Sequence, residues 1–200
     1  MTAVGLRARK VARTRVQIVE AATKLFMAQG YDATTLEQVA AAADIHKRTL
    51  LRYFPSKCHL VLHPRYSALE EFKEAVASRG EIPIVDVWQE HVTTHSRRIE
   101  ESGRARNVRL IAASEPALGP ALLAIQAEYQ AIISEELCRD LGRDPQTDVL
   151  SKVAAAALVG ANYAVGAMIL AREAYHDLEF AELEVIRLVR GGLLSSELAG

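Results

Sequence analysis

Hydrophobic side chains recur along most of this chain at the three- and four-residue intervals of an α-helix. In the first such segment Ile18, Ala22 and Phe26 share one face, and Gly30 supplies a stop signal. The alternating runs and hairpin turns that would indicate a β-sheet are nearly absent. The pattern therefore predicts an all-α protein of about nine helices.

Three short helices are expected near the N-terminus. The second opens with a capping-box pattern, Thr34 followed three residues later by Glu37. A break at Asp44 separates it from a third helix, which runs from about His46 and ends before Pro55, because a residue that precedes proline avoids the helical region. This spacing is typical of a helix-turn-helix, although the shape alone also occurs in proteins that do not bind DNA.

Longer helices fill the rest of the chain. Their expected ranges are 57–78, 84–101, 104–114, 118–140, 147–173 and 177–197. Pro64 lies inside the first range and should kink or split that helix. Since no flexible linker interrupts the pattern, we expect an N-terminal domain over residues 1–60, comprising a basic arm and the helix-turn-helix, to continue directly into a helical domain over residues 61–200.

Charge is distributed unevenly between these two parts. The whole chain has 24 basic and 25 acidic side chains, a net charge of −1 that by itself argues against a nucleic-acid partner. Residues 1–60, however, hold ten basic and four acidic side chains, a net charge of +6, which leaves −7 for residues 61–200. The asymmetry predicts an anionic partner for the N-terminal domain alone.

The third helix offers side chains suited to duplex DNA. Its expected exposed face comprises His46, Lys47, Arg48, Thr49 and Arg52. Lysine and arginine can donate paired hydrogen bonds to guanine, whereas Thr49 and Tyr53 can donate to phosphates. Lys57 would add a phosphate contact at the start of the fourth helix. The basic segment 7–15 is expected to be an arm that lies along the phosphate backbone or enters the minor groove.

The C-terminal part predicts buried helices rather than a membrane span. The apolar run 153–171 is rich in alanine and glycine, carries Asn162 in its middle, and lacks a one-sided positive flank. Such small residues permit close helix approach, so we expect the last two helices to pair with their mates in a homodimer; two core helices of a monomer are the alternative. The two cysteines, Cys58 and Cys138, form no disulfide framework, and without an N-terminal apolar signal we expect a cytoplasmic protein.

A small-molecule site is expected among the helices of the C-terminal domain. The candidate residues are those with polar tips on expected apolar helices: Trp88, His91, His95, Tyr129, Asn162 and Tyr163. The pairs His59/His63 and His91/His95 have the spacing that places two imidazoles on one helix face, but no third ligand is evident, so we expect neither a metal nor a cofactor.

Residues 14–60 resemble the DNA-binding domain of the TetR family of transcriptional regulators. The resemblance rests on Ile18-Val19-Glu20-Ala21-Ala22, Leu25-Phe26, Gly30-Tyr31, Thr34-Thr35, Val39-Ala40 and the signature from Thr49 to Lys57. The stretch from Arg48 to Lys57 is similar to an actinobacterial branch of the family that includes sensors of acyl-CoA-type ligands. The chain departs from the family pattern where glycine is usual at Asp44 and tyrosine at Leu51.

The resemblance implies a repressor that binds a palindromic DNA operator as a homodimer and is released by a small apolar or amphipathic effector, with an acyl-CoA-like molecule as one candidate. It adds Thr35 to the expected DNA contacts. Common enzyme motifs are absent, so we expect no enzymatic activity. A helical metal-binding enzyme and a protein-binding adaptor remain as alternatives.

Overall fold

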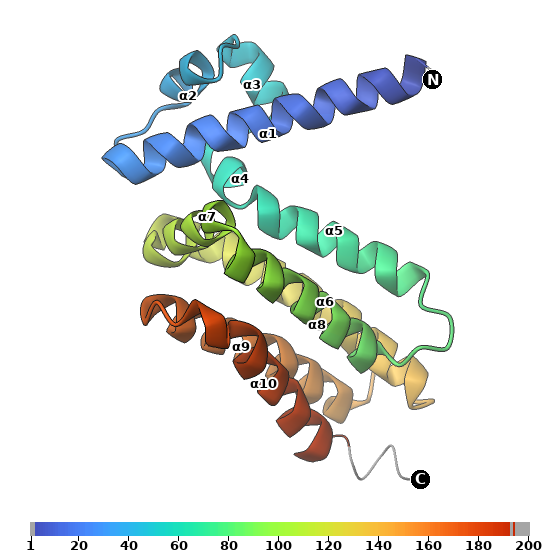
Figure 1. Ribbon diagram of the computed structural model, residues 1–200. Helices are drawn as coiled ribbons and strands as arrows, with labels where there is room; N and C mark the ends of the chain where they lie inside the picture. The colour runs from blue at the N-terminus through green and yellow to red at the C-terminus, as the bar shows by residue number, and fades with distance from the viewer. Residues whose placement is uncertain (1–2, 193, 195–200) are drawn as a thin grey trace. The chain divides into compact units, whose positions relative to one another are not determined.

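A computed structural model describes residues 3–192 and Leu194. Every regular element among these residues is helical, which confirms the predicted fold class (Figure 1). The backbone forms two compact units. The first comprises the chain up to Pro64 together with Asn107–Leu118, and the second comprises Arg65–Arg106 and the chain from Gly119 onward.

The first unit contains the predicted helix-turn-helix. Its complete helices are α1 (Ala3–Gln29), α2 (Leu36–Ala42), α3 (Lys47–Tyr53) and α4 (Lys57–Val61). Apolar side chains on the inner faces of these helices form a small core that includes Ile18, Val39, Leu50 and Phe54. Helix α1 packs against α2 and α4, and α2 packs against α3.

The expectation that residues 7–15 form an arm before the first helix is wrong, because α1 begins at Ala3 and is continuous for 27 residues. Arginine, lysine and alanine are strong helix formers, and no proline interrupts the segment. The apolar period of the sequence begins only near Ile18, so it marks where α1 meets the core and not where the helix starts. In the view of Figure 1 the N-terminal half of α1 extends beyond α3.

The expected helix over residues 57–78 is split, as the position of Pro64 suggests. Helix α4 ends at Val61, Leu62 is its C-cap, and α5 (His63–Ala77) starts immediately afterwards. Pro64 therefore lies in the first turn of α5, where its missing N–H needs no partner within the helix.

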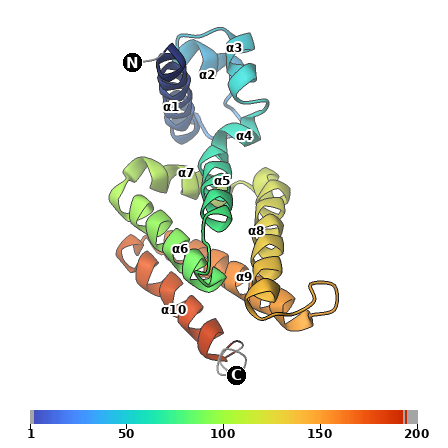
Figure 2. The same cartoon turned by 90° about the vertical axis from the view of Figure 1, so that its right-hand side faces the viewer.

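The second unit is a helical bundle. Its remaining helices are α6 (Ile84–Glu101), α7 (Gly103–Ser114, whose later part belongs to the first unit), α8 (Gly119–Asp140), α9 (Val149–Ala171) and α10 (Leu178–Gly192). Helix α9 packs against α8 and α10, while α6 packs against α8 and α10 (Figure 2). Short 3₁₀ turns at Pro116–Leu118 and Tyr175–Asp177 precede α8 and α10. The expected range 177–197 ends partly outside the described residues, at 193 and 195–197.

A buried ion network fixes the turn before α6. Arg79 is 6 % exposed and donates to Glu136 at 2.8 Å and to Asp140 at 2.6 Å, both on α8. The other carboxylate oxygen of Asp140 accepts from the backbone N–H of Ile84 at 2.8 Å, which satisfies a donor in the first turn of α6. Because the charges are paired and hydrogen-bonded, the arginine can be buried at this position.

Helix α9 is long and apolar enough to cross a membrane by length and composition alone. In this structure it packs within the bundle: Ala154, Leu158 and Val159 are fully buried between its neighbours. A second face of the helix, running from Val149 to Ala171, is exposed and carries mainly small or aliphatic side chains.

Candidate functional site

The start of α2 is fixed by a capping box that lies one residue later than predicted. The Thr35 hydroxyl oxygen accepts from the backbone N–H of Gln38 at 3.2 Å, and the Gln38 side chain accepts from the backbone N–H of Thr35 at 2.8 Å. Thr34, the predicted cap, is instead buried and donates to the carbonyl of Gly30 at 2.7 Å. Because the Thr35 hydroxyl acts as an acceptor in this box, its proton can still be donated to a phosphate.

The turn between α2 and α3 has an aspartate in the left-handed region, at φ +51° for Asp44. The N–H of Ile45 donates to the carbonyl of Ala40 at 3.0 Å, and the N–H of Asp44 donates to that of Ala41 at 3.1 Å. These two bonds form a Schellman motif, in which the left-handed position favours glycine. The β-carbon of Asp44 is therefore strained at this position, where the family pattern has glycine.

Helix α3 separates its core and solvent faces cleanly. Leu50 is fully buried. The predicted contact residues His46, Lys47, Arg48 and Arg52 are exposed, whereas Thr49 and Tyr53 are partly buried. Leu51, where the family pattern has tyrosine, is also exposed. The helix thus presents imidazole, ammonium and guanidinium groups together, as the sequence predicted for its exposed face.

Two of the basic side chains have protein partners that the sequence did not reveal. Lys47 forms an ion pair with Glu37 of α2, and this hydrogen bond lowers the pKa of Glu37. The Arg52 guanidinium lies over the Tyr53 ring, 5.5 Å from its centroid. Glu37 and Lys47 are ten positions apart and become neighbours only when the turn between α2 and α3 forms, so a local sequence pattern could not identify the pair.

Lys57 is positioned differently from the prediction. Its ammonium group donates to the carbonyls of Tyr31, Asp32 and Thr34 at 2.7, 3.3 and 3.2 Å, and lies 4.2 Å from the centroid of the Tyr31 ring. These contacts tie α4 to the loop that precedes α2. In this structure the Lys57 ammonium group binds the carbonyls of the loop. Its contact with a phosphate stays a prediction.

The predicted effector residues form an aromatic cluster in the second unit. Trp88, His91 and Tyr129 pack with Phe72 of α5, with ring centroids 5.0 to 5.5 Å apart. The Tyr129 hydroxyl is 3.1 Å from Nε2 of His91. Burial, aided by the charges of His95 and Arg98, lowers the pKa of His91 to about 3, so its imidazole is neutral near pH 7. Phe72 could not be identified from the sequence as a member of this cluster, because its apolar side chain carries no chemical signal.

Polar groups extend this cluster toward α10. Nε1 of Trp88 donates to the side-chain oxygen of Asn162 at 3.1 Å, and the Asn162 amide donates to the backbone carbonyl of Glu182 at 2.8 Å. His95 joins through its own contact with His91, with ring centroids 4.2 Å apart. Five of the six predicted residues are therefore connected, whereas the sixth, Tyr163, lies under the Arg65 guanidinium at 4.8 Å.

Neither metal-type histidine pair is part of a larger ligand set. Among the residues that the structure describes, no group of three His, Cys, Asp or Glu side chains could hold a metal ion. His59 instead lies 2.8 Å from the Ser56 hydroxyl, and His63 packs edge-on against Phe54 at 5.1 Å. A surface hollow of about 420 Å³, bordered by Ala131 of α8 and Lys152 of α9, does not include the aromatic cluster.

Comparison with known proteins agrees with the helix-turn-helix geometry of the first unit. Residues 18–63 match the family described as "Bacterial regulatory proteins, tetR family". The HTH-type transcriptional regulator TcmR of Streptomyces glaucescens is 46 % identical over 82 residues, which are 40 % of this chain and 36 % of TcmR. The match thus spans about a third of the length of this curated relative.

Solved structures match nearly the whole chain. SmeT, the repressor of the Stenotrophomonas maltophilia multidrug efflux pump SmeDEF, has a TM-score of 0.69 at 18 % identity, covering 90 % of this chain and 92 % of SmeT. Thermus thermophilus FadR, a TetR-family repressor solved with lauroyl-CoA, has a TM-score of 0.61 at 21 % identity, covering 90 % and 95 % of the two chains. At these identities the similarity shows a shared fold.

Proposed function

We propose that this chain is a TetR-family transcriptional regulator. It is a cytoplasmic repressor that binds a palindromic operator as a homodimer. The observation that carries the proposal is the exposed face of α3. That face presents Arg48 and Arg52 beside Lys47 and His46, in a helix-turn-helix whose second helix can enter the major groove. Two recognition helices in a dimer would read two half-sites.

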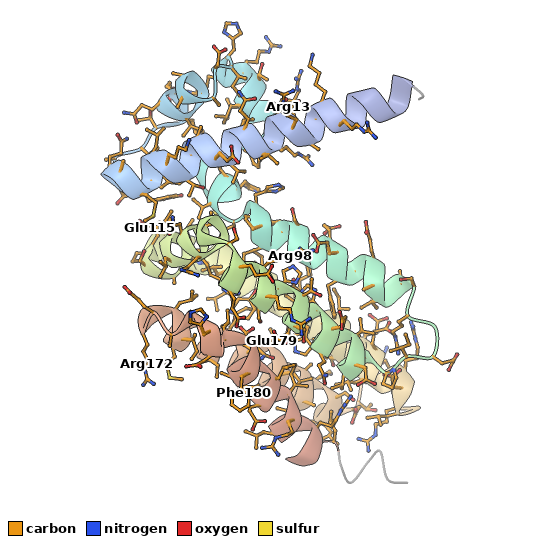
Figure 3. All side chains as sticks on the ribbon, viewed as in Figure 1. Arg13, Arg98, Glu115, Arg172, Glu179 and Phe180 are labelled. Carbon is orange, nitrogen blue, oxygen red and sulfur yellow. The ribbon has the colours of Figure 1, made fainter. Side chains whose placement is uncertain are left out.

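The surface of α9 and α10 supports a dimer through these helices. Val149 and Val153 of α9 are 68 % and 47 % exposed, and Phe180 and Leu188 of α10 are 70 % and 62 % exposed. Figure 3 labels Phe180 on α10. A Cβ added at Gly160 of α9 would meet nothing within 4 Å, so a partner helix can approach closely there. Exposed apolar surface of this kind typically marks an interaction site.

The aromatic cluster supports an effector site between α6 and α8. Its rings and the neutral His91 suit an apolar or amphipathic molecule with few polar groups. SmeT has been solved with triclosan and FadR with lauroyl-CoA, and an acyl-CoA-like compound is our candidate. Such an effector releases DNA only if it binds one conformation of the dimer better than the other.

The test is selection of an operator from a pool of random duplexes, followed by titration of the Arg48→Ala variant. We expect a palindromic consensus, and a loss of about 1–3 kcal/mol in binding to that consensus with little loss on unrelated duplex, because arginine bonded to guanine carries base preference. Lys24→Ala, at an exposed basic position on α1, is the matched control and should bind as the wild type does. No enriched sequence, or equal losses in both variants, would overturn the assignment.

A further inference from the structure

The N-terminal half of α1 carries exposed basic side chains that the helix-turn-helix does not use. Arg9, Lys10, Arg13 and Arg15 are all exposed, and the first acidic residue of the chain is Glu20. This half of the helix runs past α3 (Figure 1), and Figure 3 labels Arg13 on it. The segment is therefore a cationic surface on the helix that packs against α2 of the helix-turn-helix.

The position of Gln17 identifies the face of α1 that is directed toward the helix-turn-helix. Its side-chain amide donates to the carbonyl of Ala43, at the end of α2, at 3.1 Å. Arg13 and Lys10 precede Gln17 by four and seven residues, so they lie on the same face of α1. Arg15 is on another face, near His63, whose pKa is lowered by burial and by the charge of that arginine.

The helical form of the segment decides how it can meet DNA. An α-helix with side chains is about 10–12 Å wide, whereas the minor groove of B-form DNA is only about 6 Å wide. A flexible arm could enter that groove, but a helix cannot do so without widening it. Side chains on its surface can instead reach the phosphates that border the groove.

We infer that Lys10 and Arg13 bind backbone phosphates beside the major groove that α3 occupies, and that they add affinity without reading sequence. The inference rests on the proposed DNA-binding function. The two residues are about 4.5 Å apart along the helix axis and are held in register by a continuous helix. This preorganisation lowers the entropy cost of binding in comparison with a disordered arm.

The test compares Arg13→Gln with Arg15→Gln, two variants that each remove one positive charge from α1 but on different faces. Binding to the selected operator is measured by fluorescence anisotropy over a salt series. For Arg13→Gln we expect at least about fivefold weaker binding at 0.1 M salt and a salt slope smaller by about 1.8, because the homodimer loses one phosphate contact in each half-site. The double variant Lys10→Gln/Arg13→Gln should lose about twice that slope, and Arg15→Gln should change affinity less than twofold.

Phosphate ethylation interference on the same operator locates the contact. The double variant should lose sensitivity at one group of phosphates in each half-site, and changing the base pairs there should leave wild-type affinity unchanged. Equal behaviour of Arg13→Gln and Arg15→Gln, or dependence on those base pairs, would overturn this inference while leaving the function of α3 intact. Failure of the wild type to select any duplex would overturn the proposed function itself. Circular dichroism confirms that each variant remains helical.

Discussion

Asp44 is one of two non-glycine residues, among those that the structure describes, whose backbone lies in the left-handed region. It occupies the left-handed position of a Schellman motif, at φ +51°, where a β-carbon is unfavourable. Aspartate tolerates this region better than most residues, but glycine adopts it freely. This conformational free-energy cost arises in the turn that fixes the orientation of α3 relative to α2.

Replacing Asp44 by glycine should therefore stabilise the protein. We expect the free energy of unfolding to rise by about 0.5–1 kcal/mol in Asp44→Gly and to fall by about 1 kcal/mol in Asp44→Ala, which keeps the β-carbon but loses the tolerance of aspartate. Urea denaturation followed by circular dichroism measures both values. If the alanine variant proved as stable as the glycine variant, backbone strain could not be the cause.

Single residues also show where sequence reasoning reaches its limit. Both Thr34 and Thr35 are followed three residues later by a side chain that can complete a capping box, Glu37 and Gln38 respectively. Local sequence cannot choose between the two registers. The choice follows from burial, because Thr34 points into the core and bonds to Gly30.

At the scale of helices, the aromatic cluster joins α5, α6 and α8 around a neutral histidine. Burial among Phe72, Trp88 and Tyr129 is the main cause of the low pKa of His91, and the charges of His95 and Arg98 lower it further. The pKa of His91 is about 3 in the folded protein, against about 6.5 for an unperturbed histidine. Protonation therefore favours the unfolded chain.

This cluster should make stability fall on acidification. The unfolded chain binds a proton at His91 below about pH 6.5 while the folded chain does not until about pH 3, so the contribution is lost as pH decreases through that window. Between pH 6.5 and 4.5 we expect the wild type to lose about 2 kcal/mol more than His91→Gln, as measured by urea unfolding at each pH. The matched control is His176→Gln, at an exposed position, which should follow the wild type. Parallel curves for wild type and His91→Gln would contradict the assignment.

The extents of helices were easier to predict than their contacts. The apolar period and the flanking signals placed a helix at 84–101, which is where α6 lies. The spacing of apolar residues did not predict where α1 begins, because the part of the helix that extends beyond the core has no buried face and so no apolar period. Pairings across elements, such as Lys47 with Glu37 or Trp88 with Asn162, depend on packing that has no local signature.

At the scale of the whole molecule, the proposed dimer should depend on the exposed apolar residues of α9 and α10. Introducing a charge at Phe180 or Leu188 would bury that charge without a partner, at a cost of about 2 kcal/mol or more. We expect Phe180→Glu and Leu188→Glu each to weaken the dimer at least about thirtyfold by sedimentation velocity, and to reduce binding to a full palindrome. Leu123→Glu, at a 65 % exposed position on α8, is the control and should remain dimeric. A monomeric wild type would refute the dimer.

The exposed face of α9 has a consequence for how the protein behaves at different concentrations. When two subunits bury their exposed apolar faces against each other, association and stability are linked by mass action. The melting temperature then rises with protein concentration. A dilute subunit is left with the exposed face of α9 in contact with water, and is more readily unfolded and degraded than its dimer. The small side chains of one helix would thus couple the amount of regulator in the cell to its lifetime.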